Sequence, residues 1–226
     1  DADLGVGYDG DADRIGVVTE EGRLIFGDSL MVLFADEILS RKPGSVIVGE
    51  VKCSKTLYDE IEHLGGKPVM WKAGHSLIKA KMKETGAELG GEVSGHIFFK
   101  DRFFGHDDAL YATLRLLEIL SRTDKTITEM LSHLPKMIMT PEIRLESSDE
   151  KKFEIVEKVT EHFKSHGYKV SDVDGVRVIF EDGFGLIRAS NTQPALVQRY
   201  EASSKKRLDE IMNMMQEKLK EIENTI

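Results

Sequence analysis

The stretch from Ser45 to Trp71, SVIVGEVKCSKTLYDEIEHLGGKPVMW, contains a strand, a helix and a second strand in succession. Its apolar run Val46–Val48 is typical of a buried parallel strand, and Val69–Trp71 repeats that pattern. Apolar residues recur at helical spacing between the two runs, with Ser54 suited to begin the helix and Gly65–Gly66 to end it. This stretch predicts two parallel strands joined by a right-handed helical crossover.

The same alternation extends on both sides of this unit. Asp28 or Ser29 can begin a preceding helix, and a following helix is expected over His75–Glu84. Ile97–Phe99 then predicts another strand, and a long helix is expected to start near Asp107. The β-α-β-α order predicts a layered α/β domain.

The pattern changes near Pro135–Pro141. A helix is predicted over Ser148–Ser165, and a last helix carries its apolar residues on one face between positions 208 and 222. Strand-like runs lie between these two helices: Tyr168–Val170, Val176–Glu181, Gly185–Ala189 and Leu196–Glu201. This second part predicts an α+β domain, with a mostly antiparallel sheet and helices on one side, and a boundary near residue 137.

The 226 residues carry a formal net charge of -9. An acidic chain is poorly suited to nucleic acid or an anionic membrane surface, because both attract Lys and Arg. A phosphate ligand would therefore need a local positive site. The single cysteine, Cys53, excludes a disulfide within the chain and fits a reducing, cytoplasmic setting.

Asp9, Asp11 and Asp13 alternate along the sequence Asp9-Gly-Asp-Ala-Asp-Arg14, between two strand-like segments. In a curled loop their carboxylates can converge on one cation, and hard oxygen ligands suit Mg²⁺ or Ca²⁺. An EF-hand is excluded because Arg14 stands where that loop requires glycine, and strands flank it in place of helices. An acidic hairpin turn without metal stays an alternative.

A second motif is Gly91–His96, where Glu92 and Ser94 would point the same way on an extended segment. An acceptor beside a donor suits neighbouring sugar hydroxyls, and the flanking glycines let a ligand approach the backbone. A glycine-rich surface turn is the alternative interpretation.

A third motif, Arg188–Pro194, lies between two expected strands, with Arg199 downstream. One guanidinium, hydroxyls, an amide and backbone N–H groups can form a phosphate cradle. The candidate side chains are Arg188, Ser190, Asn191, Thr192 and Arg199. A polar turn that ends at Pro194 is the alternative.

Lys52, Lys72 and His75 follow expected strands. Strand ends in open α/β sheets are where ligands usually bind, so these residues are candidate phosphate contacts or general acids and bases. Solvated loop charges are the competing interpretation.

Together these motifs resemble the α-D-phosphohexomutase superfamily, of the phosphomannomutase/phosphoglucomutase type. The resemblance covers essentially the whole chain and rests on six stretches in the order of the family: Asp9–Arg14, Val51–Cys53, Trp71–Lys79, Gly91–His96, Phe104–Asp108 and Arg188–Pro194.

The resemblance implies an isomerase that interconverts hexose 1-phosphate and hexose 6-phosphate through a phosphoserine and a bisphosphate. Residues 1–23 would end the second domain of the family, residues 24–137 would form the third, and residues 138–226 a fourth, TATA-binding-protein-like domain. No serine stands in the Ser-His-Asn context of the family. The chain is therefore expected to be a C-terminal fragment, inactive without the N-terminal domains of the same enzyme.

The resemblance also assigns roles. Mg²⁺ on Asp9, Asp11 and Asp13 would bind the phosphoserine, assisted by Arg14. Glu92 and Ser94 would hold sugar hydroxyls, the motif at Arg188 would hold the existing phosphate, and Lys52 and His75 are candidate catalytic groups. Val93 stands where members of the family often have Met or Gln, which leaves the preferred sugar open, so a phosphoglucosamine mutase is an alternative. Because the serine is missing, a fragment that only binds metal and phosphosugar is another.

Overall fold

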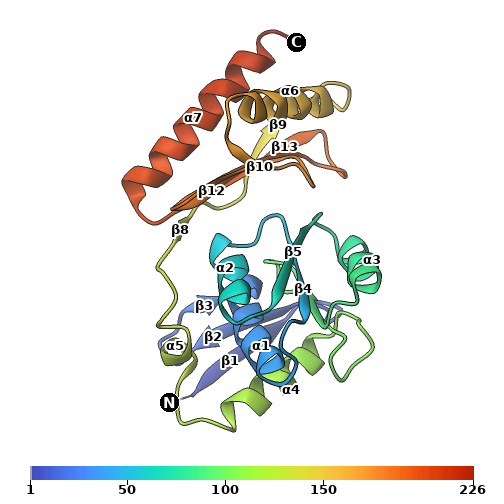
Figure 1. Cartoon of the computed structure of the whole chain (residues 1–226), viewed down its shortest axis with the longest axis vertical. Helices are drawn as coiled ribbons and strands as arrows, with labels where there is room; N and C mark the ends of the chain where they lie inside the picture. The colour runs from blue at the N-terminus through green and yellow to red at the C-terminus, as the bar shows by residue number, and fades with distance from the viewer. Residues whose placement is uncertain (1) are drawn as a thin grey trace. The chain divides into compact units, whose positions relative to one another are not determined.

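The computed structural model of the protein describes residues 2–226 and divides into two compact units. The first unit ends at Leu134 and the second comprises Pro135–Ile226. Figure 1 shows the order of their elements along the chain. The predicted boundaries at residues 23 and 137 stay predictions.

The first unit begins with a small antiparallel sheet that holds the acidic loop. Strands β1 (Leu4–Tyr8) and β2 (Ile15–Thr19) form a hairpin in which Tyr8 pairs with Ile15. Strand β3 (Leu24–Ile25) adds to the other side of β2. Ile15 and Val17 of β2 are buried while β1 is more exposed, so β2 fixes the hairpin to the core.

The second sheet of this unit has the strand order β5-β4-β6-β7. Strands β4 (Val46–Glu50), β5 (Lys67–Trp71) and β6 (Leu89–Gly91) run parallel, and β7 (Ile97–Phe99) is antiparallel to β6. The central place of β4 brings residues that follow β4, β5 and β6 to one edge of the sheet.

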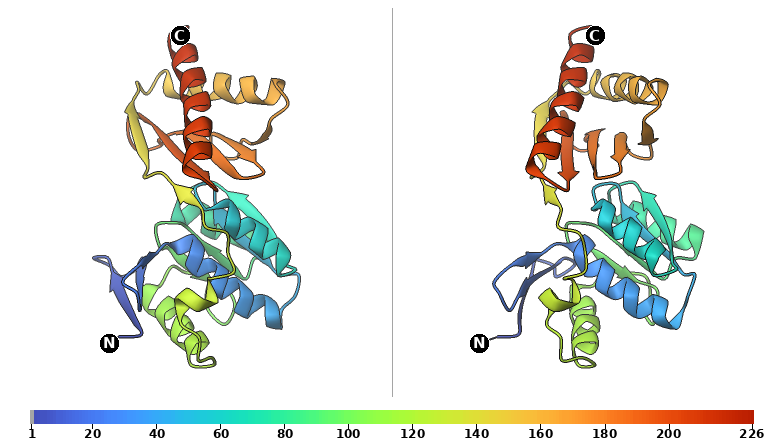
Figure 2. Two further views of the ribbon diagram at one scale, coloured as in Figure 1. Left: turned by 90° about the vertical axis from the view of Figure 1, so that its left-hand side faces the viewer. Right: turned by 60° about the vertical axis from the view of Figure 1, so that its left-hand side comes forward.

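Helices cover both faces of this sheet because alternate residues of β4 point to opposite sides. Ile47 belongs to the core formed with α1 (Gly27–Arg41) and α2 (Lys55–His63), whereas Val48 packs with α3 (His75–Thr85). Helix α4 (Ala109–Leu120) packs beside β2 (Figure 2), and α5 (Ile127–Met130) closes the unit.

The second unit is an antiparallel sheet with helices on one face (Figure 1). Its strand order is β10-β11-β12-β13-β8, and β9 also pairs with β13. The strands are β8 (Ile138–Met139), β9 (Ile143–Glu146), β10 (Lys169–Ser171), β11 (Val176–Phe180), β12 (Gly183–Ala189) and β13 (Ala195–Ala202). Helices α6 (Lys152–Ser165) and α7 (Lys205–Glu223) share a core with one face of the sheet.

The predicted fold class is confirmed: a layered α/β unit precedes an α+β unit. Within residues 2–226, no helix has both the length and the apolar character required to span a bilayer.

Candidate active site

The acidic loop folds so that its three carboxylates converge. Asp9, Asp11 and Asp13 each offer an oxygen, and these oxygens lie within 4.8 Å of one another. Ala12 has a φ of 58°, and its N–H donates to the Asp9 carbonyl at 3.3 Å, which curls the chain between β1 and β2. Because the hairpin register is fixed on both sides, the loop is held in this curled form.

Arg14 fixes Asp9 at one side of the loop. Its Nε donates to Asp9 Oδ2 at 2.5 Å, and its backbone N–H donates to Asp9 Oδ1 at 3.1 Å. The hydrogen bond from the Arg14 side chain is the main reason that the pKa of Asp9 falls to about 2. Asp9 is therefore ionised at every pH at which the protein would work.

The pKa of Asp13 shifts in the opposite direction. Burial raises its pKa, His96 opposes that effect, and the charges of Asp11 and Asp9 raise the pKa further. Carboxylates that repel one another in this manner are stabilised by a cation placed among them. Three converging oxygen donors with no sulfur fit Mg²⁺, which prefers carboxylate and water ligands.

Glu92 is buried at the start of Gly91–His96, the predicted sugar-recognition motif. Its Oε1 accepts from the Gly74 N–H at 2.6 Å, and its Oε2 lies 2.9 Å from His96 Nδ1. Burial favours the neutral acid, but the bonds from His96 and Gly74 outweigh it and leave the pKa of Glu92 lowered. Glu92 is therefore an oriented carboxylate, able to accept from hydroxyl groups.

Ser94 is exposed and lines a hollow of about 380 Å³ together with Asp9 and Arg14. The contact that creates this arrangement is between backbones: the Ile15 N–H donates to the Gly95 carbonyl at 3.1 Å. Gly95 has a φ of 98°, and an added Cβ would lie 2.3 Å from the Ile15 carbonyl oxygen, so the close approach requires glycine. The sugar-recognition motif and the acidic loop are thus fixed side by side.

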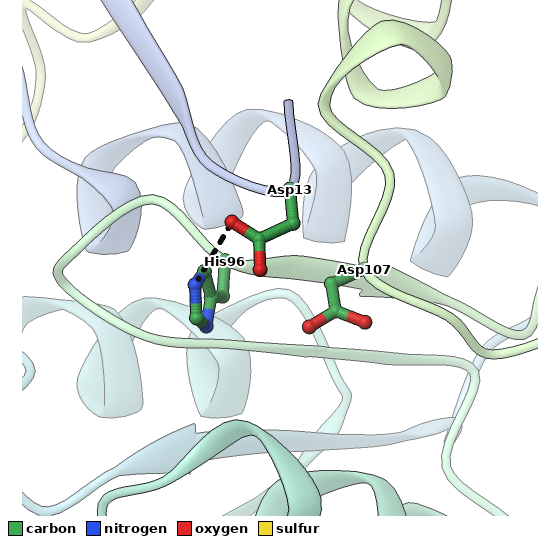
Figure 3. A group of neighbouring side chains, drawn as sticks. All are labelled: Asp13, His96 and Asp107. Carbon is green, nitrogen blue, oxygen red and sulfur yellow. Dashed lines mark ion pairs between the residues drawn. The ribbon is translucent and has the colours of Figure 1, made fainter. Parts of the chain in front are cut away.

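His96 joins these two elements, although no sequence pattern marked it as a site residue. Its Nε2 lies 3.4 Å from Asp13 Oδ1, and Figure 3 shows Asp107 beside the pair. Burial lowers the pKa of His96, but the bond to Glu92 and the charges of Glu92, Asp13 and Asp107 raise it overall. His96 can therefore carry a proton close to the acidic loop. Its position four residues after Glu92 was the only available signal.

His75 and Lys52 lie at the strand ends, as expected. His75 Nδ1 is 3.3 Å from Asp107 Oδ2, and its ring centroid is 5.6 Å from that of His96. Lys52 Nζ is 3.4 Å from Oε2 of Glu50, which is fully buried. Lys72 is exposed, and its side chain has no hydrogen bond or ion pair within residues 2–226.

The predicted phosphate loop connects β12 to β13 in the second unit. Ser190 Oγ accepts from the Gln193 N–H at 3.1 Å and lies 3.4 Å from the Thr192 nitrogen, which curls the loop. Asn191 and Thr192 are exposed at its tip. Lys152, which the sequence did not indicate, donates from Nζ to the Gln193 carbonyl at 3.0 Å and is buried.

Arg188 and Arg199 lie on the same face of the second sheet, because Arg188 pairs with Val197 and Leu186 with Arg199. Asp174 holds Arg188 by accepting from its Nε at 2.9 Å and its Nη2 at 3.3 Å. Arg199 Nε lies 2.8 Å from Met139 Sδ. Each guanidinium is therefore oriented by a neighbour before a ligand arrives.

The arrangement in the first unit can hold a divalent cation, accept bonds from sugar hydroxyls and carry protons on histidine. The second unit presents hydroxyls, an amide and guanidinium groups around one loop, the donors that a phosphate requires.

Comparison with known proteins agrees with this description. Residues 26–137 match the phosphoglucomutase/phosphomannomutase α/β/α domain III, and residues 142–218 match the C-terminal domain of the same family. The chain belongs to the phosphoglucomutase/phosphomannomutase family, and the resemblance predicted from the motifs is confirmed.

Individual relatives are similar over nearly the whole chain. The chain is 47% identical to Pseudomonas aeruginosa phosphomannomutase/phosphoglucomutase over 225 residues, which are 100% of this chain and 49% of the relative. It is 46% identical to Neisseria gonorrhoeae phosphoglucomutase, over 94% of this chain and 46% of the relative.

A solved structure shows the same similarity. The crystal structure of a phosphoglucomutase/phosphomannomutase family protein from Burkholderia thailandensis aligns with a TM-score of 0.90 and 46% identity, over 98% of this chain and 47% of that one. The chain thus spans about half the length of the curated relatives it matches.

Proposed function

We propose that this chain forms the metal-binding, sugar-binding and phosphate-binding parts of a phosphohexomutase. The complete enzyme would interconvert hexose 1-phosphate and hexose 6-phosphate through a phosphoserine and a bisphosphate intermediate. The serine would belong to the half of the relatives that this chain does not match. We also propose a cytoplasmic location, in keeping with the single buried cysteine.

The convergence of Asp9, Asp11 and Asp13 on a rigid hairpin is the observation that carries this proposal. These carboxylates would hold Mg²⁺, which would supply positive charge to the phosphoryl group during transfer. Arg14 lies next to Asp9 and keeps a half-exposed guanidinium available for the same phosphate.

The remaining residues would bind and orient the sugar phosphate. Glu92 would accept hydrogen bonds from sugar hydroxyls, and Ser94 would contact a neighbouring hydroxyl from the hollow beside Arg14. His75 and Lys52 would supply proton transfer or phosphate contacts at the strand ends.

The loop at Arg188 would bind the phosphate that the substrate already carries. Ser190, Asn191 and Thr192 offer short polar groups beside the oriented Arg188, and Arg199 lies on the same sheet face. A site of this kind accepts either phosphate of a bisphosphate, so the intermediate can reorient between the two transfers.

Calorimetric titration with Mg²⁺ tests the proposal on the chain as it stands. The native chain should bind with a saturable isotherm, and Asp11→Ala should abolish binding because one of three ligands is lost. Glu21→Gln is a matched control, since Glu21 lies in the next turn of the same sheet and pairs with Arg23. If Asp11→Ala binds as well as the native chain, the metal assignment is wrong.

A further inference from the structure

Glu50 is a buried carboxylate for which the proposed reaction has no role so far. It is the last residue of β4, at the edge of the sheet where the proposed site residues gather, and none of its surface is exposed. A buried carboxylate is costly unless it is paired and hydrogen-bonded, so its partners indicate what it does.

Both of its side-chain oxygens are directed at parts of the proposed site. Oε1 accepts from the Val93 N–H at 2.9 Å, and Val93 is the residue between Glu92 and Ser94. Oε2 lies 3.4 Å from Lys52 Nζ. One carboxylate thus links the backbone of the sugar-recognition motif to the ammonium at the adjacent strand end.

We infer that Glu50 is a positioning residue, which fixes the sugar-recognition motif through the Val93 N–H and holds Lys52 in place. The assignment of Glu92, Ser94 and Lys52 to the site rests on the proposed function. Its two side-chain oxygens contact Val93 and Lys52, so its action is on the sugar side of the site.

The surroundings of Glu50 also make its charge sensitive to pH. Burial raises its pKa to about 7, Lys52 opposes that shift, and Glu92 adds to it. Tyr58 of α2 is a further polar neighbour, whose hydroxyl donates to the Glu50 backbone carbonyl at 2.5 Å. The ionised carboxylate binds the Val93 N–H more strongly than the neutral acid does, because charge-assisted hydrogen bonds are stronger. The hydrogen bond from the Val93 N–H to Glu50 should therefore become stronger as pH rises through about 7.

Nuclear magnetic resonance can test this inference without a catalytic assay. In the native chain, labelled with ¹⁵N and with ¹³C at glutamate carboxyls, the Glu50 carboxyl should titrate near pH 7. The chemical shift of the Val93 amide proton should change with pH in a step that has the same midpoint. Glu50→Gln should remove that step, even if the nearby His96 still causes another, and Glu62→Gln on the exposed surface of α2 should keep it.

Measuring the affinity for glucose 6-phosphate at pH 8 tests whether the contact between Glu50 and Val93 affects sugar binding. Glu50→Gln should weaken binding roughly tenfold, because a charge-assisted bond to the Val93 N–H and an ion pair with Lys52 are lost together. Glu62→Gln should bind as the native chain does.

A Glu50 that titrates near pH 4, a Val93 amide that does not follow it, or unchanged affinity in Glu50→Gln would each overturn the inference. If the native chain does not bind glucose 6-phosphate, the proposed function fails instead, and the Val93 amide alone decides the role of Glu50. If Glu50→Gln does not fold, the matching midpoints of Glu50 and Val93 in the native chain decide it.

Discussion

At the residue scale, the acidic loop contains three aspartates with different properties. Asp9 is ionised and held by Arg14, whereas Asp13 is more easily protonated because it is partly shielded and lies beside like charges. One carboxylate is thus held ionised, and another lies 3.4 Å from the His96 ring. The loop is chemically asymmetric although its sequence is regular.

Replacing Arg14 with alanine should release Asp9 from its main partner. The titration midpoint of the Asp9 carboxyl should rise from about 2 to nearly 4, the value of an unperturbed aspartate. Carbon-13 titration of the aspartate carboxyls measures this directly. Arg23→Ala, which removes an exposed arginine paired with Glu21, should leave Asp9 unchanged. A midpoint that stays near 2 in Arg14→Ala would contradict the account.

Lys152→Met should weaken phosphate binding by the second unit. The buried ammonium donates to the Gln193 carbonyl and holds the loop that carries Ser190. Bonds that involve a charged group contribute about 1.5–3 kcal/mol, so the Kd for glucose 6-phosphate should rise by roughly tenfold or more. Lys151→Met, at the exposed neighbouring position, is the control and should bind normally. Equal affinities for the two variants would exclude a role for Lys152.

The sequence indicated the polar candidate residues of the site but not the residues that support them. Aspartates at alternate positions and an arginine at a strand end are local patterns, visible without a fold. Glu50, Lys152 and Asp107 act through partners 28 to 43 residues away, or through loops whose shape depends on packing. No local pattern identifies a contact of that kind.

At the element scale, helix α1 begins earlier than its sequence indicates. Asp28 or Ser29 was expected to start it, but the helix begins at Gly27, whose N–H donates to the Val93 carbonyl at 3.2 Å. Asp28 is not the N-cap residue of the helix, and its side chain accepts a hydrogen bond from the Ser54 N–H at 2.8 Å. The contact with the sugar-recognition motif therefore decides where the helix starts.

Gly27→Ala should destabilise the first unit. A Cβ at this position would lie 2.1 Å from the Glu92 carbonyl oxygen, so the helix or the motif must move. Overpacking of this kind costs about 1–3 kcal/mol, which urea unfolding measures. Gly16→Ala is the control, since its Cβ would meet nothing closer than 3.9 Å. The packing argument fails if the two variants are equally stable.

A buried ion cluster joins α1, α4 and the loop after β7. Asp101 is fully buried and accepts from Arg41 at 2.7 Å and from Arg115 at 3.0 Å, with Lys42 3.0 Å away. Asp101→Asn should lower the free energy of unfolding by about 1.5–3 kcal/mol, because charge-assisted bonds from Arg41 and Arg115 are weakened while Glu37 still pairs with Arg115 at 2.8 Å. Asp59→Asn, which breaks an exposed pair with Lys55, should cost less than about 1 kcal/mol.

The effect of Asp101 should depend on pH in one direction. Burial raises its pKa, but hydrogen bonds from Arg41 and Lys42 outweigh burial and leave the pKa lowered. The stabilisation is then complete above the unfolded pKa, about 3.9, and is lost as pH falls through the lower folded value. The difference between native and Asp101→Asn stability should persist to about pH 4 and shrink below it. A difference that grows on acidification would contradict this.

Most elements of the fold could be predicted, because strong apolar periodicity marks them. Strand β6 could not: two of its three residues, Gly90 and Gly91, are poor strand formers. They are glycines because Met82 and Met31 pack over them, where a Cβ would lie 2.5 and 2.7 Å from sulfur. The start of α6 is also four residues later than expected, since residues 148–151 form a turn.

At the scale of the whole molecule, we propose that the two units contribute different binding groups to one reaction. The first unit carries the acidic loop and the proposed sugar-recognition motif, and the second carries the proposed phosphate loop, each supported by its own core. We expect a variant in one unit to change the binding of one ligand and leave the binding of the other unchanged. Asp11→Ala should weaken metal binding, and Arg188→Ala should weaken phosphate binding.

The most direct test of the central claim is mutase turnover in a protein that joins this chain to an N-terminal half like that of its relatives. Phosphorus-31 spectra would follow glucose, mannose and glucosamine 1-phosphates in the presence of Mg²⁺. We predict conversion of at least one to its 6-phosphate, and a fall of roughly 100-fold or more in Asp11→Ala. No conversion of any of the three by the folded protein, or an unchanged rate in Asp11→Ala, would contradict the account.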